Sequence, residues 1–115
     1  HKMPFITIDT NARTEVTAEM LDELSEIAVR VLNKPKNYVT VKINSGAAIL
    51  FGGTTENIGA LVEFKSIGFG DKKAELARQL KDFAVRRFGA EGLFVGIHFA
   101  DMPAANVSHD GKLMG

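Results

Sequence analysis

Cysteine is absent from this chain of 115 residues. Its absence excludes disulfides, thiolate catalysis and cysteine-ligated metals. An excess of charge of either sign is also absent, because 14 Lys and Arg residues balance 14 Asp and Glu residues. Net charge therefore gives no reason to expect binding to nucleic acid or to an anionic membrane.

Long hydrophobic runs are missing as well. No apolar run reaches the roughly 20 residues that are needed to span a bilayer, and no signal peptide is recognised. We therefore expect a cytoplasmic protein without membrane insertion, with secretion by a route that needs no signal peptide as the alternative.

The length and composition of the chain are those of one ordered globular domain. Hydrophobic residues make up 45% of the chain and charged residues 24%, and a chain of this length has room for a single core. His1-Lys2-Met3 resembles the remnant of a purification tag, with a natural extension as the less favoured interpretation. We expect residues 4–115 to form the single domain.

The first half of the chain predicts a strand, a helix and a strand. Residues 5–10 are rich in Ile, Thr and Phe, which favour a strand. Between residues 20 and 32, apolar side chains recur every three or four positions, which indicates an amphipathic helix capped by residues 14–17. Lys34-Pro35 ends this helix, because the residue before a proline avoids the α region. Residues 38–44 alternate apolar and polar side chains, as a half-buried strand does.

The second half predicts the same order again. Residues 60–67 are expected to form a strand, and a glycine-containing loop then leads to a helix that ends before Gly89. Alternation over residues 93–99 predicts the last strand. Short turns or a short strand are expected in the tail, residues 102–115.

Two strand-helix-strand units predict an α/β fold. Right-handed crossovers pair the strands of each unit in parallel, and the simplest packing is a four-stranded mixed sheet with both helices on one face. Phe64 and Phe94 are expected to point away from Leu61 and Leu93 on their own strands, so that both faces of the sheet carry apolar side chains. A single chain would leave one of these faces in water, which predicts an oligomer.

Pro4 is the first candidate for chemistry. If synthesis starts at Met3 and that methionine is removed, the Pro4 nitrogen becomes a secondary amine. Packing against Ile67 and the nearby charge of Lys34 are expected to lower the pKa of this amine from about 8, which suits a base at neutral pH. Lys34 is a candidate for binding a carboxylate or stabilising an enolate. The commoner role of such a lysine is a solvated charge at a helix end.

Five motifs occur in an order that resembles the macrophage migration inhibitory factor and D-dopachrome tautomerase family. They are Met3-Pro4-Phe5-Ile6 with Thr10-Asn11, Lys34-Pro35 followed by Tyr38, Phe51-Gly52-Gly53-Thr54-Thr55-Glu56, Lys65-Ser66-Ile67-Gly68 and Asp101-Met102-Pro103-Ala104-Ala105-Asn106-Val107. The resemblance covers residues 4–107. It implies the tautomerase fold, a homotrimer around a central channel, and active sites between adjacent subunits.

The resemblance also implies a function. Pro4 would shuttle a proton, without a cofactor, in the keto–enol tautomerisation of small aromatic α-keto acids of the phenylpyruvate or dopachrome type. The residues implied in binding the substrate or lining the pocket are Lys34, Ser66, Ile67, Tyr38 and Val107. A cell-surface receptor is a further partner implied by the family. With residues 1–3 attached, we expect the chain to be inactive as a tautomerase, because the Pro4 nitrogen is then an amide.

Four positions depart from the usual pattern of the family. Gly96 and His98 stand where a tyrosine and an asparagine are usual, and His109 and Met114 where a tryptophan and a phenylalanine are common. Gly96 removes an aromatic wall and predicts a wider, wetter pocket. His98 either replaces the asparagine that a neighbouring subunit contributes or abolishes its contact. The paired-cysteine motif of some members is absent, which excludes thiol oxidoreductase activity.

These departures leave alternatives to an efficient enzyme. One is a cytokine-like trimer that binds a receptor and has weak or vestigial activity, and another is a structural trimer. No metal site is expected, since the spacing of His98, Asp101 and His109 matches no known site. Gly52-Gly53 predicts a turn rather than a phosphate-binding loop.

Overall fold

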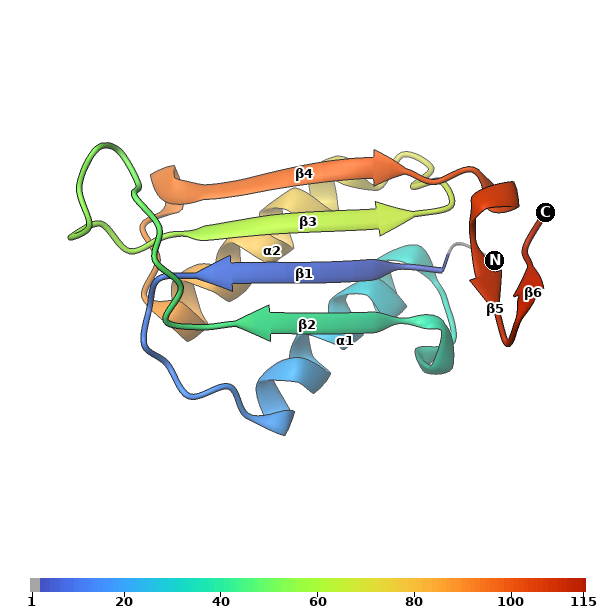
Figure 1. Cartoon of the computed structure of the whole chain (residues 1–115), viewed down its shortest axis with the longest axis horizontal. Coiled ribbons are helices and arrows are strands. Elements are labelled where there is room, and N and C mark those ends of the chain that lie inside the picture. Colours follow the sequence, from blue (N-terminus) through green and yellow to red (C-terminus); the bar gives the residue numbers. More distant parts are fainter. Residues whose placement is uncertain (1–2) are drawn as a thin grey trace.

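The computed structural model describes residues 3–115, so that two residues of the suspected tag remnant lie outside it. A mixed sheet of four strands, in the order β2-β1-β3-β4, is covered on one face by two helices (Figure 1). The elements follow along the chain as β1 (Phe5–Thr10), α1 (Ala18–Leu32), β2 (Thr40–Asn44), β3 (Ala60–Ser66), α2 (Lys73–Phe88) and β4 (Val95–Asp101).

Strand directions confirm the two predicted units. β1 and β2 are parallel and are joined by α1, while β3 and β4 are parallel and are joined by α2. The two units meet where β1 pairs with β3 in an antiparallel ladder. The predicted four-stranded sheet with both helices on one face is therefore confirmed.

The helices begin and end where the sequence predicts. The Thr17 side chain accepts a hydrogen bond from the Met20 backbone N–H, 3.2 Å away, and so caps the start of α1. Asn33 ends α1 with a φ of 53°, and Gly89 ends α2 with a φ of 68°. Both positions need a left-handed backbone, which asparagine and glycine tolerate best.

The core lies between the helices and one face of the sheet. Ile6, Ile8, Val62 and Phe64 point from the two central strands into this layer and are almost completely buried. Phe64 makes ring contacts there with Phe69 at 5.3 Å and Phe99 at 5.8 Å between ring centroids. The packing explains why burial alternates strictly along β3.

Two predicted strands have different bounds in the structure. Tyr38 belongs to a 3-10 turn, η1 (Lys36–Tyr38), and β4 is preceded by a second such turn, η2 (Gly92–Phe94). Phe94 was predicted to project from the open face of a strand. It lies in the turn η2 instead. The Phe94 ring packs beside the Phe51 ring, with 6.2 Å between centroids, because the turn directs this side chain toward the loop before β3.

The open face of the sheet is more polar than predicted. Phe64 points toward the helices, so the apolar side chains of the open face that lie on the central strands are Leu61 and the half-buried Phe5. The neighbouring positions of this face carry Thr7, Lys42, Glu63, Lys65 and His98. The prediction of two apolar faces was thus wrong in part, and this argument for an oligomer is weaker than expected.

The tail, for which short turns or a short strand were expected, forms a short hairpin. A 3-10 turn, η3 (Ala104–Asn106), leads into β5 (Ser108–His109), which pairs with β6 (Lys112–Leu113). Figure 1 shows this hairpin at the end of the sheet where β1 begins and β3 and β4 end. Over residues 3–115, neither helix has the length and apolar character that crossing a membrane requires.

Candidate active site

Pro4 lies immediately before β1 and is almost completely buried. Its carbonyl oxygen accepts a hydrogen bond from the Thr40 backbone N–H, 3.0 Å away, which ties it to the start of β2. Met3 is 5% exposed and has a φ of 45°. This left-handed conformation is disfavoured for methionine, so the residue bonded to the Pro4 nitrogen is held in a strained and buried place.

Ser66 and Ile67 lie next to Pro4 at the same end of the sheet. Phe5 pairs with Lys65 across the β1–β3 ladder, so one step further along this register Pro4 faces Ser66. Ser66 is buried, and its carbonyl oxygen accepts a hydrogen bond from the Met102 backbone N–H at 2.8 Å. The start of β1 and the ends of β3 and β4 are thereby brought together.

Tyr38 lies at this end on the side of β2, in the turn that follows Lys34 in the chain. Lys34 follows the cap of α1, and its backbone N–H donates to the Val29 carbonyl oxygen at 3.1 Å. Lys36 fixes the next turn through an ion pair with Asp22, with 3.1 Å between the Lys36 Nζ and a carboxylate oxygen. This contact, a hydrogen bond to Asp22, is the main cause that raises the pKa of Lys36.

The C-terminal hairpin closes the same end. Val107 is buried, and its carbonyl oxygen accepts a hydrogen bond from the Met114 backbone N–H at 2.8 Å. The rings of Tyr38 and His109 lie 5.0 Å apart between centroids, which joins the hairpin to η1. The chain thus gathers Pro4, Ser66 and Val107 with Tyr38 at one end of the sheet, although they are far apart in sequence.

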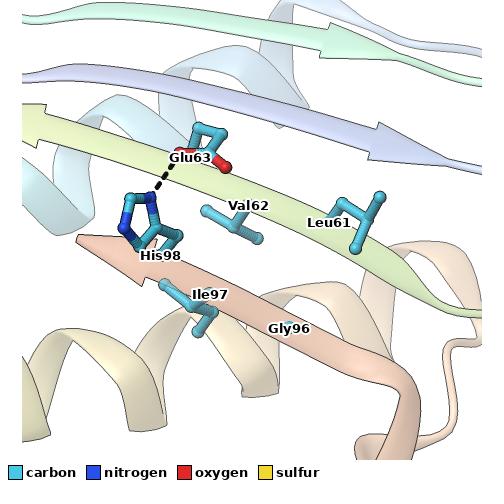
Figure 2. Close-up of a pocket in the computed structure, with 6 residues that line it drawn as sticks. All are labelled: Leu61, Val62, Glu63, Gly96, Ile97 and His98. Atoms are coloured by element: carbon cyan, nitrogen blue, oxygen red, sulfur yellow. Dashed lines mark hydrogen bonds and ion pairs between the residues drawn. The ribbon is translucent and has the colours of Figure 1, made fainter. Parts of the chain in front are cut away.

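The predicted site residue His98 lies away from the Pro4 end of the sheet. It stands in the middle of β4 on the open face, directly across from Glu63 on β3. The His98 Nδ1 atom and a Glu63 carboxylate oxygen are 2.9 Å apart (Figure 2). Asp101 at the end of β4 is three residues away, which corresponds to about 10 Å along a strand. Within one chain, His98 therefore forms a second region, separate from the Pro4 end.

A shallow groove of about 290 Å³ accompanies this pair. Leu61 and Gly96 lie at one end of it, and Glu63 and His98 at the other (Figure 2). Gly96 offers no side chain to fill the space above β4. Gly96 therefore lies in a groove on the open face, between Leu61 and the Glu63–His98 pair, and the wider substrate pocket expected at Gly96 stays a prediction.

Two contacts in these regions were not expected from the sequence. Glu63 was not recognised as the partner of His98, and His109 was not recognised as a contact of Tyr38. The first is readable once β3 and β4 are aligned in parallel register, because Glu63 and His98 are then opposite each other. The second has no sequence signal, since it depends on how the tail folds back.

The donor groups of these regions give little support for a bound metal. Within residues 3–115, no three side chains of the His, Asp and Glu types lie close enough together to hold an ion. What the structure shows at the Pro4 end is a buried proline beside Thr40 and Ser66; a lysine and an apolar wall near it stay predictions.

Known proteins resemble this chain along nearly its whole length. The profile of the family described as "Macrophage migration inhibitory factor (MIF)" matches residues 3–115. A macrophage migration inhibitory factor homolog from Trichuris trichiura is 32% identical over 113 residues, which are 96% of this chain and 98% of that protein. A D-dopachrome decarboxylase-B from Xenopus laevis is 22% identical over 115 residues, 97% and 98% of the two chains.

Solved structures agree with this match. The crystal structure of a macrophage migration inhibitory factor homologue from Prochlorococcus marinus superposes with a TM-score of 0.86. It is 28% identical in sequence, and the match covers 96% of this chain and 99% of that one. The order of the motifs, the doubled strand-helix-strand sheet and these similarities together show that the chain belongs to the macrophage migration inhibitory factor family.

Proposed function

We propose that this protein is a cofactor-independent keto–enol tautomerase of small aromatic α-keto acids, and that its Pro4 nitrogen shuttles the proton. Membership of the family supports a tautomerase-like or cytokine-like function in general. The observation that carries the more specific proposal is the position of Pro4, buried at the start of β1 and tied to Thr40 and, through the register, next to Ser66.

The proposed step needs Pro4 as the first residue of the chain, because only then is its nitrogen a secondary amine. The amine removes a proton from the carbon next to the keto group, and the electron pair of that C–H bond forms the C=C bond of the enolate. The protonated amine then gives the proton to the enolate oxygen, which yields the enol and restores the free amine. Burial favours the neutral amine, and the Lys34 charge favours the enolate.

We further propose that the active unit is a homotrimer, since trimers are typical of this family. Sedimentation at micromolar concentration should give three times the mass of one chain. A mass of one chain would contradict the trimer.

The test of the proposed function compares two preparations, the full chain that begins at His1 and a shorter chain that begins at Pro4. Phenylpyruvate and D-dopachrome tautomerisation should occur only in the second, because the first holds the Pro4 nitrogen in a peptide bond. Equal activity in both would remove the Pro4 nitrogen from the mechanism. Absence of activity in both would favour a cytokine-like, receptor-binding trimer, with the departures at Gly96 and His98 as the causes of the lost activity.

A further inference from the structure

Met3 is buried although it is the first residue that the structure describes. Its exposed fraction is 5%, and Pro4 beside it is almost completely buried. The ends of a chain are usually disordered and open to proteases unless burial and hydrogen bonds tie them down. The Met3–Pro4 peptide bond is therefore poorly placed for hydrolysis, although its hydrolysis would create the Pro4 amine.

The backbone that follows this bond enters a strand with neighbours on both sides. The Pro4 carbonyl oxygen accepts a hydrogen bond from the Thr40 backbone N–H at 3.0 Å. Phe5 then pairs with Thr40 of β2 and with Lys65 of β3. Figure 1 shows β1 between these two strands. Both ladders must open at this end before the first residues can leave the sheet.

An aminopeptidase needs the first residues of its substrate outside their own fold. The enzyme takes the N-terminal residue into its pocket and holds the next residues in its own active-site cleft. Proteolysis of a folded chain proceeds through a locally opened form, and its rate falls with the population of that form. We therefore expect the folded chain to be a poor substrate for the removal of Met3.

The start of the chain is accessible while the chain is being made. β1 ends at residue 10, whereas its partners β2 and β3 begin at residues 40 and 60. The N-terminal segment is synthesised first, and β1 has no sheet to join until these partners exist. An enzyme that acts during synthesis therefore meets the Met3–Pro4 bond in an unfolded segment.

For a chain whose synthesis starts at Met3, we propose that a methionine aminopeptidase removes Met3 only before β1 pairs with β2 and β3. A chain that folds with Met3 in place stays unprocessed. In the step itself, water hydrolyses the Met3–Pro4 peptide bond: its hydroxyl group joins the Met3 carbonyl carbon, and its proton goes to the Pro4 nitrogen, which becomes the secondary amine. The consequence rests on the proposed function: the share of active protein is set by whether processing or folding comes first.

The test follows the mass of a chain that begins at Met3, expressed while the methionine aminopeptidase of the host is inhibited. The folded chain and a synthetic peptide of residues 3–11 are incubated with the same purified methionine aminopeptidase. The peptide has no sheet to hold its first residues, so it should lose its methionine about 100-fold faster or more. Rates that agree within about tenfold would overturn the proposal.

Two substitutions at one position test the contact that holds Pro4. Thr40→Pro removes the N–H that donates to the Pro4 carbonyl oxygen, and proline is tolerated at the first residue of a strand. It should speed the loss of Met3 from the folded chain up to about tenfold, which is the change in an opening equilibrium that one hydrogen bond can make. Thr40→Val keeps the N–H and is the matched control, with an unchanged rate. Equal rates for the two variants would overturn the role of this contact.

Hydrogen exchange supplies a second measurement that needs no variant. In the full chain that begins at His1, the Thr40 amide should exchange about 100-fold more slowly than in an unstructured peptide, because it exchanges only when its contact with Pro4 opens. Unprotected exchange of this amide would overturn the proposal, whether or not the Thr40→Pro variant folds.

The outcomes distinguish this inference from the proposed function, because the loss of Met3 is read from mass and not from turnover. If the folded chain resists processing but the chain that begins at Pro4 converts no keto acid, the proposed function fails and the order of processing and folding stands. If the folded chain is processed as fast as the peptide, the inference fails, while turnover by the chain that begins at Pro4 still supports the proposed function.

Discussion

The Pro4 end of the sheet and the Gly96 groove are built in opposite ways. At the Pro4 end, buried residues from both chain ends and from the ends of strands are held by backbone hydrogen bonds, such as those from Thr40 to Pro4 and from Met102 to Ser66. In the groove, two exposed side chains on neighbouring strands meet through a single contact between Glu63 and His98.

The difference shows which features of each region tolerate change. A buried, backbone-held site keeps its geometry when a side chain is altered, so substitutions there act mainly on chemistry. An exposed pair on a rigid sheet can be exchanged at little cost in stability, so the groove tolerates substitution. The departures from the family pattern at Gly96 and His98 agree with this view.

Replacing the secondary amine of Pro4 should have the largest effect. In a chain that begins at residue 4, Pro4→Gly is expected to lower kcat for phenylpyruvate by about 100-fold, the lower end of the range for general acid–base catalysis. Glycine keeps an N-terminal amine but loses the ring that fixes its position. The oligomeric mass should not change. Unaltered turnover would contradict the assignment of the reaction to the buried Pro4 end of the sheet.

Substitutions on the two faces of β3 should lower the free energy of unfolding by very different amounts. Phe64→Ala leaves a cavity in the core, where Phe64 is 0% exposed, and is expected to lower the free energy of unfolding by about 3–5 kcal/mol. Leu61→Ala on the open face of the same strand should cost less than about 1 kcal/mol. Urea denaturation measures both. A similar loss for the two variants would mean that the open face is buried in the assembly.

Lys34 should contribute to substrate affinity more than to rate. Lys34→Ala is expected to raise the KM for phenylpyruvate about tenfold, because a hydrogen bond to a charged group contributes about 1.5–3 kcal/mol. Lys34→Arg, which keeps the charge, should recover part of this affinity. If steady-state kinetics show the same KM for the alanine variant, Lys34 is only a solvated charge at the end of α1.

Charges on the outer side of the helices should have the smallest effect. Burial would raise the pKa of Glu23, but hydrogen bonds from Arg86 and Arg87, both at 2.6 Å, outweigh it and lower the pKa. The stabilisation is therefore present above the pKa of the unfolded state and is lost as the pH falls through the lower folded value. Glu23→Gln should cost about 1 kcal/mol at pH 7.

The same variant supplies its own control in acid. Near pH 3, Glu23 is largely protonated in the unfolded chain and increasingly so in the folded one, so the difference between the two proteins should shrink. Chemical denaturation at both pH values checks the sign. A difference that grows in acid would contradict the assignment of the lowered pKa to these arginines.

Local sequence patterns predicted those elements well that depend on interactions between neighbouring residues in the sequence. The apolar spacing of α1, its Thr17 cap and the glycine after α2 depend on neighbours in sequence, and each was confirmed. The errors occurred at strand ends. Tyr38 and Phe94 continue an apolar pattern, but both lie in 3-10 turns, since alternation does not reveal where a ladder of backbone hydrogen bonds begins.

By itself, the sequence determined the family, the order of elements and the identity of Pro4, Lys34 and the segment around Ser66 as candidates. These follow from motifs and from periodicity, which are properties of short segments. Only the tertiary structure decided that Glu63 faces His98, that Tyr38 meets His109 and that Gly96 opens a groove. Such contacts depend on strand register and on the path of the tail, which arise from packing between segments that are distant in the chain.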